Sequence, residues 1–342
     1  MSTATQKGLC QPTLYQLNSS TPGIKILGER YLASDTQINC DWTGSGFEMD
    51  VAHEGGDIVF CASATANCFF RAYVDGSAWE KSEYEIPAYF LVTPEISRIV
   101  LADVPAGKHR IKLIKVTGYT LARAQVTSVS FCGTILEVAP EQNELYIEFV
   151  GDSICCGWGT IGAHQGTYTD QDGTLAYPLK VAAALNADYA VTALSGQGLV
   201  FGPFCTVTEG YLYGSANRSK EQPFAFARKA DIVVINIGTN DFGNRNNEKD
   251  PIDGERFKAS YLDFLNTVVE KNGADCKIYC LYKTMNDTFH ESILAACAEF
   301  GASVKPVTTF EMARANGGKH PTIEENVKYT EDVLRLLGFD QI

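Results

Sequence analysis

The spacing of apolar residues changes near residue 140, and this change constrains the fold more than any other feature of the chain. Up to about residue 135 the sequence consists of short β-prone runs, separated by glycine-containing turns at intervals of about 8–12 residues. Seven of these runs are expected to be strands: 47–52, 57–63, 68–74, 83–92, 97–104, 109–117 and 126–133. The pattern predicts an all-β, jelly-roll-like sandwich over residues 1–140.

Over residues 141–342 apolar strands alternate with helices. Strands are expected at 145–150, 189–194, 231–238, 277–282 and 303–307. Helices are expected at 177–186, 257–272, 290–301 and 323–338. Continuous apolar strands that alternate with helices are typical of a parallel sheet covered on both faces. We therefore predict a second domain with a doubly wound, flavodoxin-like α/β fold, in which ligands bind beyond the carboxyl ends of the strands.

The charge balance excludes several classes of partner. The chain has 28 Lys and Arg against 41 Asp and Glu, a formal net charge of −13. A nucleic-acid-binding protein needs a basic surface to replace the counterions of phosphate, and an anionic membrane or a strongly acidic polymer would be repelled. Because 45% of the residues are hydrophobic and 20% are charged, the composition is that of a globular protein. We expect a soluble protein with neither a nucleic acid nor a membrane as partner.

The cysteines and the N-terminal residues point to a cytoplasmic location. The eleven cysteines are irregularly spaced, several lie in apolar runs, and no CxxC pair occurs, so a zinc-ribbon or thioredoxin-type motif is absent. The N-terminal residues lack the basic and apolar segments of a secretory signal, and no stretch approaches the roughly 18 apolar residues that span a membrane. The histidines form no HExxH motif. We expect neither a metal nor another cofactor.

Four short blocks carry the residues on which chemistry would depend. The blocks are Gly151-Asp152-Ser153-Ile154, Ser195-Gly196-Gln197-Gly198 and Gly238-Thr239-Asn240-Asp241, each after a predicted strand, and Gly318-Lys319-His320-Pro321-Thr322 before the last helix. A serine hydroxyl and an imidazole are the nucleophile and the base that acyl transfer needs. A glycine N–H and an asparagine amide can donate to a developing oxyanion. The blocks therefore predict an acyl-transfer site at the strand ends.

In this order, the blocks GDSI, LSGQG, GTND and HPT resemble those of the SGNH (GDSL-like) hydrolases, over about residues 145–342. With the β region added, the whole chain resembles carbohydrate esterase family 2, whose members join a jelly roll to an SGNH domain and remove acetyl groups from plant polysaccharides. The resemblance implies that Ser153 is the nucleophile and His320 the general base. It also implies an oxyanion hole made of the N–H groups of Ser153 and Gly196 and the side chain of Asn240.

One position departs from the family pattern. Most SGNH enzymes have an aspartate three residues before the histidine, and this chain has Gly317 there. Some members of carbohydrate esterase family 2 orient the imidazole with a backbone carbonyl instead and work as a Ser-His dyad. We predict such a dyad, with Asn316 as an alternative orienting group. Asp152 and Asp241 are expected to order their own loops through side-chain to backbone hydrogen bonds.

Three residues are candidates for substrate binding. Trp158 follows the proposed nucleophile closely, where its ring would either stack against a sugar or belong to the core. Tyr282 and Met285 follow the fourth predicted strand, where a loop would meet the cleft, and the family has an aromatic residue in about that region. Cys155 and Cys156 are expected to pack, because a second nucleophile would need a base of its own.

The resemblance implies a metal-free O-acetyl esterase acting on acetylated oligosaccharides or polysaccharides of the mannan, glucomannan or xylan type. One alternative is an SGNH lipase or thioesterase acting on small acyl esters, which a broad apolar acyl channel would favour. Another is a catalytically inactive carbohydrate-binding protein, which only the missing aspartate supports. The sequence leaves open the sugar, the hydroxyl position, the contact of the β domain with substrate and the oligomeric state.

Overall fold

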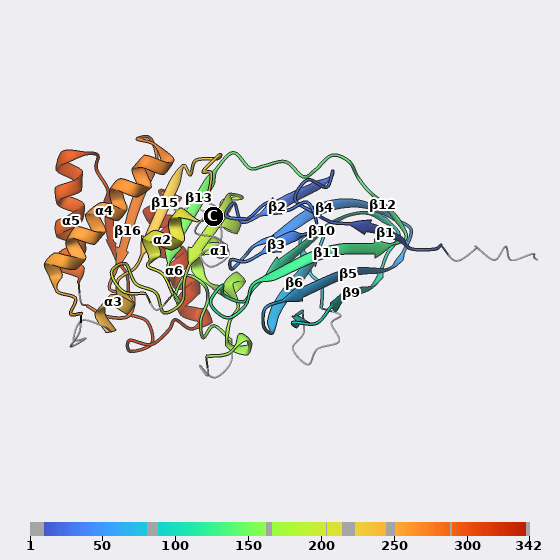
Figure 1. The fold of residues 1–342 in the computed structure, drawn as a ribbon, viewed down its shortest axis with the longest axis horizontal. Helices are drawn as coiled ribbons and strands as arrows, with labels where there is room; N and C mark the ends of the chain where they lie inside the picture. The colour runs from blue at the N-terminus through green and yellow to red at the C-terminus, as the bar shows by residue number, and fades with distance from the viewer. Residues whose placement is uncertain are drawn as a thin grey trace, which may run out of the picture.

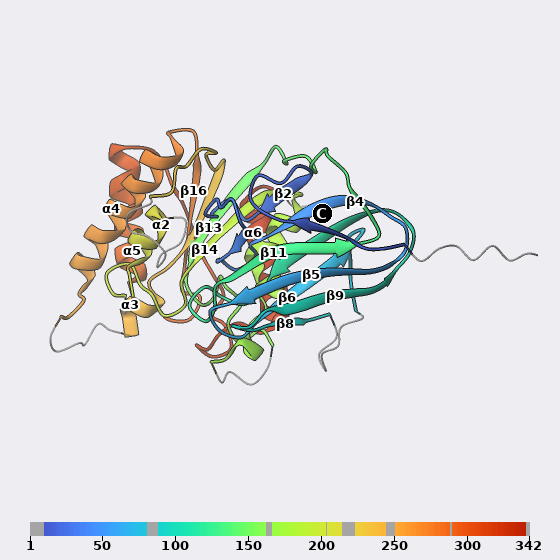
Figure 2. The same cartoon turned by 45° about the vertical axis from the view of Figure 1, so that its right-hand side comes forward.

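The computed structural model describes residues 10–80, 88–161, 166–202, 204–213, 223–243, 250–287 and 289–339. Two antiparallel sheets, here called the β region, lie at one end of the molecule, and a parallel sheet with its helices, the α/β region, lies at the other (Figure 1). Figure 2, turned by 45°, keeps the same division, with the helices at the left and the antiparallel strands at the right. The two regions meet side by side along the long axis.

The β region consists of two antiparallel sheets. One contains β1 (Thr13–Gln16), β3 (Ile38–Cys40), β5 (Gly56–Ala64), β9 (Ser97–Val104) and β11 (Ala124–Phe131). Its order is β1-β11-β5-β9, with β3 beside β11. The other contains β2 (Ile24–Leu27), β4 (Gly46–His53), β6 (Cys68–Val74), β7 (Ser77–Ala78), β8 (Phe90–Val92), β10 (Gly107–Lys115) and β12 (Gly133–Ile135). Its order is β12-β4-β10-β6-β7, with β2 beside β4 and β8 beside β6.

The core of the β region follows from the alternation of side chains along its strands. In β4, Phe47, Met49 and Val51 are buried while the residues between them are partly exposed. These side chains join Phe60 and Val126, which come from the other sheet, in one hydrophobic cluster. Full burial of each such side chain stabilises the fold by about 1.5–3 kcal/mol. The two sheets therefore share one core between their inner faces.

The α/β region is built on a five-stranded parallel sheet. Its strands are β13 (Tyr146–Gly151), β14 (Asp188–Ala193), β15 (Ile232–Asn236), β16 (Lys277–Tyr282) and β17 (Thr308–Glu311). Their order is β14-β13-β15-β16-β17, and every neighbouring pair is parallel. The chain moves outward from β13 in both directions, so the loops after β13, β14 and β15 meet at the point where the strand order reverses. Ligands bind at this point in sheets of this kind.

Helices cover both faces of the parallel sheet. They are α1 (Tyr177–Ala184), α2 (Val207–Leu212), α3 (Thr239–Gly243), α4 (Gly254–Asn272), α5 (His290–Ser303) and α6 (Ile323–Leu336), with short 3-10 helices η1 (Tyr168–Asp170) and η2 (Gly173–Leu175). Phe264 and Phe300 of α4 and α5 join one hydrophobic cluster, whereas Leu179 and Val333 of α1 and α6 join another. Within the part of the chain that the structure describes, no helix is both long and apolar enough to cross a membrane.

Most of the predicted elements are confirmed. Of the predicted strand 83–92 the structure describes β8 only, since residues 81–87 lie outside the described residues. The strand predicted at 303–307 is wrong, because α5 continues to Ser303 and the fifth strand is β17. Pro306 lacks the N–H that a strand inside the ladder donates. The short elements β1, β2, β3, α2 and α3 were not predicted. The boundary at residues 140 and 141 stays a prediction, between the end of β12 and the start of β13.

A buried arginine joins the β region to the α/β region. Arg30 Nε lies 2.7 Å from Glu148 Oε1 in β13, and both side chains are almost fully buried. The guanidinium also lies 4.2–4.4 Å from the ring centroids of Tyr211, Phe224 and Phe226. A charge that is buried in this way is retained only where its partner and its hydrogen bonds are in place. The two regions are thus held together by a specific contact.

Candidate active site

Ser153 lies in a tight turn directly after the central strand β13. The N–H of Ile154 donates to Asp152 Oδ1 at 3.0 Å, and the N–H of Trp158 donates to the carbonyl of Ser153 at 3.0 Å. Ser153 is buried, so its hydroxyl lies at the bottom of the site rather than on the surface. Because β13 is buried along its whole length, the turn is fixed to a strand inside the core.

His320 is brought to Ser153 by the segment that precedes α6. The imidazole Nε2 lies 2.8 Å from Ser153 Oγ, which is hydrogen-bond distance. Thr322 caps the helix, accepting from the N–H of Glu325 at 3.2 Å, and Glu325 Oε2 accepts from the N–H of Thr322 at 2.8 Å. Glu325 Oε1 also accepts from the N–H of Asn316 at 2.6 Å. One glutamate therefore fixes the histidine segment to the start of α6.

The turn before His320 has a backbone conformation that favours glycine at position 317. Asn316, Gly317 and Gly318 all have a positive φ, of 38°, 64° and 94°. A residue with a Cβ is strained in this region, so Gly317 suits the turn better than an aspartate would. The predictions that a backbone carbonyl or Asn316 orients the imidazole stay predictions.

The other two blocks lie against the nucleophile turn. The amide Nδ2 of Asn240, in α3, donates to the carbonyl of Gln197 at 2.9 Å and to Asp152 Oδ2 at 3.3 Å. It therefore ties the loop after β14, which contains the exposed Gly196, to the turn that contains Ser153. The structure thus brings the four blocks to one edge of the sheet. The roles of Ser153 N–H, Gly196 N–H and Asn240 as oxyanion donors stay predictions.

Two buried aspartates hold these loops. Asp152 binds within its own turn, as predicted. The carboxylate of Asp241 also makes side-chain to backbone hydrogen bonds, accepting from the N–H groups of Leu199, Val200 and Phe201 at 2.8, 2.7 and 3.1 Å. These three donors lie about forty residues earlier in the chain, so Asp241 fixes the loop after β14, which the prediction did not include.

Both aspartates have raised pKa values. Burial raises the pKa of Asp152 to about 7, against the lowering effect of the Ile154 N–H, and the neighbouring Asp241 raises it further. Burial also raises the pKa of Asp241, although the three backbone N–H donors lower it. Near neutral pH a part of the Asp152 carboxyl is therefore protonated. A neutral carboxyl beside Ser153 would repel a developing oxyanion less than a carboxylate would.

Of the three candidate substrate-binding residues, Trp158 and Met285 lie near the histidine segment and Tyr282 lies elsewhere. The ring of Trp158 is half-buried and its centroid lies 6.1 Å from that of His320, so this residue lines the site. The backbone carbonyl of Met285 lies beside Gly318 in the histidine turn, while its side chain packs against a hydrophobic cluster. Tyr282 instead stacks on His290, with ring centroids 6.4 Å apart. The structure gives no contact between Tyr282 and the Ser153 turn.

The cysteines beside the nucleophile are packing residues in this structure. Cys155 and Cys156 are buried, and burial raises the pKa of both thiols, that of Cys156 to about 12. A thiol with such a pKa is not ionised near neutral pH and is a weak nucleophile. Among the described residues, no three His, Cys, Asp or Glu side chains are grouped in a way that could hold a metal ion.

Sequence reasoning missed the contact between the β region and the loop after the nucleophile. Tyr89 Oη donates to Asp172 Oδ2 at 2.5 Å, and Arg71 Nη1 lies 3.4 Å from the same oxygen. The carbonyl of Asp172 accepts from Thr160 Oγ1 at 3.2 Å, and the same hydroxyl lies 2.8 Å from the carbonyl of Gly157. The β region thus supports the segment that carries Trp158. No motif or spacing in the sequence marks these residues.

Comparison with known proteins identifies the family. The model of the GDSL-like Lipase/Acylhydrolase family matches residues 149–337, more than half of the chain. The curated "Cellulase/esterase CelE" of Acetivibrio thermocellus is 26% identical over 270 residues, which cover 77% of this chain and 31% of that protein. An "Acetylxylan esterase / glucomannan deacetylase" of Cellvibrio japonicus is 26% identical over 285 residues, which cover 77% of this chain and 73% of that protein. This chain thus corresponds to less than a third of the length of the first relative.

Solved structures of carbohydrate esterase family 2 have the same fold. An esterase of this family from Clostridium thermocellum, in complex with cellohexaose, superposes with a TM-score of 0.79 at 25% identity, covering 93% of this chain and 100% of that one. The corresponding esterase from Cellvibrio japonicus gives a TM-score of 0.80 at 17% identity and covers 97% and 100%. The resemblance predicted from the four blocks is confirmed. The chain belongs to the GDSL-like lipase and acylhydrolase family.

Proposed function

We propose that the chain is an O-acetyl esterase that removes acetyl groups from acetylated plant oligosaccharides or polysaccharides, such as mannan, glucomannan or xylan. The observation that carries this proposal is the 2.8 Å distance between His320 Nε2 and Ser153 Oγ, at the strand-end edge of a GDSL-like hydrolase fold. The similarity to esterases of carbohydrate esterase family 2 supports the substrate class. The acidic surface is compatible with a neutral glycan.

The first half of the reaction uses the Ser-His dyad. Ser153 Oγ attacks the carbonyl carbon of the acetyl ester while His320 Nε2 takes the hydroxyl proton. The negative charge that develops on the carbonyl oxygen is stabilised by the N–H groups of Ser153 and Gly196 and by the Asn240 amide. The intermediate collapses as the bond to the sugar oxygen breaks, and His320 gives its proton to that oxygen. The products are the free sugar hydroxyl and an acetyl-Ser153 ester.

The second half repeats these steps with water. His320 takes a proton from a water molecule, whose oxygen attacks the acetyl carbonyl. The same donors hold the second oxyanion, and the bond to Ser153 Oγ then breaks. His320 returns the proton to Ser153, and acetate leaves. Apart from the substrate and water, every group in these steps belongs to the chain.

Acetate release tests this proposal. We expect wild-type protein to release acetate from acetylated glucomannan and acetylated xylan, and Ser153→Ala to lower the rate by about 10³-fold or more. Ser130→Ala, at a half-buried serine of β11, is the matched control and should keep the wild-type rate. Release that persists in Ser153→Ala would contradict the proposed nucleophile. Faster hydrolysis of 4-nitrophenyl butyrate than of the acetate would favour the lipase alternative.

The finer description of the fold belongs to the same proposal. We infer that residues 1–140 form a jelly-roll-like domain and residues 141–342 a hydrolase domain. The separate hydrophobic clusters of the two regions support this division. Limited proteolysis should cut first between β12 and β13, at residues 136–145, if the two parts are distinct units. The cytoplasmic location stays a prediction, which fractionation of the producing cells would test.

A further inference from the structure

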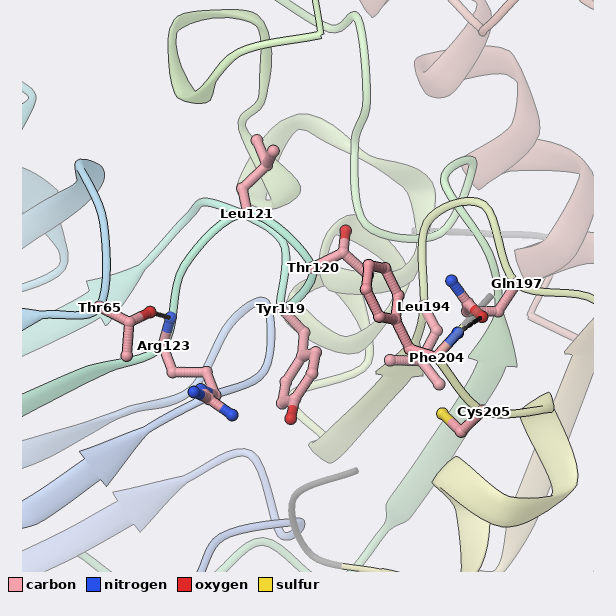
Figure 3. Close-up of a pocket in the computed structure, with 9 residues that line it drawn as sticks. All are labelled: Thr65, Tyr119, Thr120, Leu121, Arg123, Leu194, Gln197, Phe204 and Cys205. Carbon is pink, nitrogen blue, oxygen red and sulfur yellow. Dashed lines mark hydrogen bonds between the residues drawn. The ribbon is translucent and has the colours of Figure 1, made fainter. Parts of the chain in front are cut away.

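A pocket of about 120 Å³ lies where the two regions meet (Figure 3). The β region contributes one turn and the loop that precedes β11, and the α/β region contributes the loop after β14. The lining residues are Thr65, Tyr119, Thr120, Leu121, Arg123, Leu194, Gln197, Phe204 and Cys205. The volume corresponds to roughly ten water-sized spheres of about 10–15 Å³ each, which is room for one sugar unit.

One wall of the pocket belongs to the loop after β14, which contains the proposed oxyanion donor Gly196. Gln197 follows Gly196 directly, and its backbone carbonyl accepts the Asn240 amide at 2.9 Å. Its side-chain oxygen accepts from the N–H of Phe204 at 3.4 Å, which ties the two lining residues together (Figure 3). Gln197 therefore both lines this pocket and accepts a hydrogen bond from Asn240.

The far wall carries a positive charge. In a chain of net charge −13, the described residues that line this pocket include the cation of Arg123, and none of them is Asp or Glu. Its guanidinium carbon lies 5.9 Å from the ring centroid of Tyr119, and the Tyr119 ring packs on Trp42 at 4.8 Å. The backbone N–H of Arg123 donates to Thr65 Oγ1 at 3.0 Å (Figure 3). These contacts fix the segment that places the guanidinium at the pocket.

The remaining lining residues suit a sugar ring. Thr120, which is half-buried, offers a hydroxyl group to a sugar hydroxyl. Phe204 is 64% exposed, and its ring offers an apolar face at the pocket edge. Small-molecule sites typically combine such apolar faces with a few polar groups that fix orientation. The added element here is a cation that a neutral sugar does not need.

We propose that this pocket is a subsite for a sugar carboxylate, and that the enzyme acts best on acetylated glycans that carry a uronic acid unit close to the acetylated sugar. The carboxylate binds the Arg123 guanidinium, which matches it with two parallel N–H donors. The ring of the uronic acid lies against Tyr119 and Phe204 while the acetyl group of the neighbouring sugar lies at Ser153. This inference rests on the proposed esterase function.

The test compares two substrates that differ by one branch. Acetylated xylo-oligosaccharides with and without a glucuronic acid branch are hydrolysed by wild type, Arg123→Gln, Arg123→Lys and the control Arg98→Gln, which changes an exposed arginine of β9. We expect wild type to show a kcat/KM about five- to tenfold higher on the branched substrate. Arg123→Gln should bring this ratio to about one, Arg123→Lys should leave an intermediate ratio, and Arg98→Gln should keep the wild-type ratio.

The outcomes separate this subsite from the proposed activity. A ratio of one in wild type, or a ratio that Arg123→Gln leaves unchanged, overturns the subsite even though acetate is released. If no substrate releases acetate, the proposed activity fails, and calorimetry with the deacetylated oligosaccharides decides on the pocket. Tighter binding of the branched oligosaccharide by wild type than by Arg123→Gln would retain the subsite, and equal binding would overturn it. Arg123→Lys gives the same readouts if Arg123→Gln does not fold.

Discussion

Two sets of buried carboxylates in this molecule are held differently. Where the β region meets the α/β region, each carboxylate has a cation: Glu148 lies 2.7 Å from Arg30, and Asp188 lies 2.7 Å from Lys25. Lys25 and Arg228 lower the pKa of Asp188, and removing one partner of such a buried pair would leave an uncompensated charge. Loss of these ion pairs is therefore expected to lower the stability of the protein, and to lower activity only because less protein is folded.

At the strand-end edge the carboxyl groups are held by N–H donors. Asp152 accepts from the N–H of Ile154 and from Asn240, and Asp241 accepts from three backbone N–H groups. Their raised pKa values follow from this burial without a neutralising cation. The comparison suggests that the molecule keeps strong fixed charges at the contact between the regions. At the edge where an oxyanion forms it keeps carboxyls that are more easily protonated.

The largest expected effect is a loss of activity without a loss of stability, when His320 is replaced. His320→Ala should lower kcat on acetylated substrate by about 10³-fold or more, because Ser153 Oγ then has no base at 2.8 Å. His320 is half-buried and outside both ion pairs, so the midpoint of thermal unfolding should change little. The measurements are acetate release and calorimetric melting of the same preparation. A variant that keeps a tenth of the wild-type kcat would contradict the proposed dyad.

Removal of the buried arginine at the contact between the two regions should lower the stability of the protein strongly. Arg30→Ala leaves Glu148 buried without its partner, and the free energy of unfolding should fall by about 3–5 kcal/mol. Arg110→Ala is the matched control, because Arg110 pairs with Asp50 at 2.8 Å on the exposed side of β10. That pair should contribute less than about 1 kcal/mol. Urea unfolding of the full chain measures the free energy of unfolding of both variants. Equal losses in Arg30→Ala and Arg110→Ala would show that the buried Arg30–Glu148 pair contributes no more than an exposed pair.

Substitution of Asp241 should lower both the free energy of unfolding and kcat to a moderate degree. Asp241→Asn keeps an oxygen for Val200 and Phe201 but replaces the acceptor of the Leu199 N–H by a donor, at a cost of about 1–3 kcal/mol. A Cβ on Gly198 would lie 2.5 Å from the Asp241 carboxyl, so this loop and the aspartate are closely fitted. We expect kcat to fall about 10- to 100-fold as the loop shifts. An unchanged kcat together with the lower stability would separate Asp241 from the site.

The sequence predicts the strand-end blocks well, because a buried strand and the residues that follow it are neighbours in the chain. Partners that lie far apart in the chain are not predicted: Glu148 stands in an apolar run, but its cation lies 118 residues earlier. Asp241 was assigned to its own loop for the same reason. The strand at 303–307 failed because the apolar pattern outweighed Pro306. Trp158 stayed ambiguous because spacing does not fix which way a ring points.

The last expected effect is gradual: the free energy of unfolding should change with pH because of Asp152. Its pKa is about 7 in the folded protein and 3.8 as an ordinary value, so between these values the folded state binds more protons than the unfolded state. The free energy of unfolding contributed by this carboxyl should therefore fall as pH rises, by up to about 1.4 kcal/mol per pH unit, and level off above about pH 7.

Urea unfolding of wild type and Asp152→Asn from about pH 5 to about pH 8 measures this slope. Asparagine does not titrate and keeps an acceptor for the Ile154 N–H, so the free energy of unfolding of wild type minus that of Asp152→Asn should fall as the pH rises to about 7. Asp188→Asn is the contrasting variant, because Lys25 and Arg228 lower the pKa of Asp188 and its stabilisation is lost only as the pH falls through that value. Its difference from wild type should stay flat over the same range. Parallel slopes for the two variants would remove the distinction between carboxyls held by cations and carboxyls held by N–H groups.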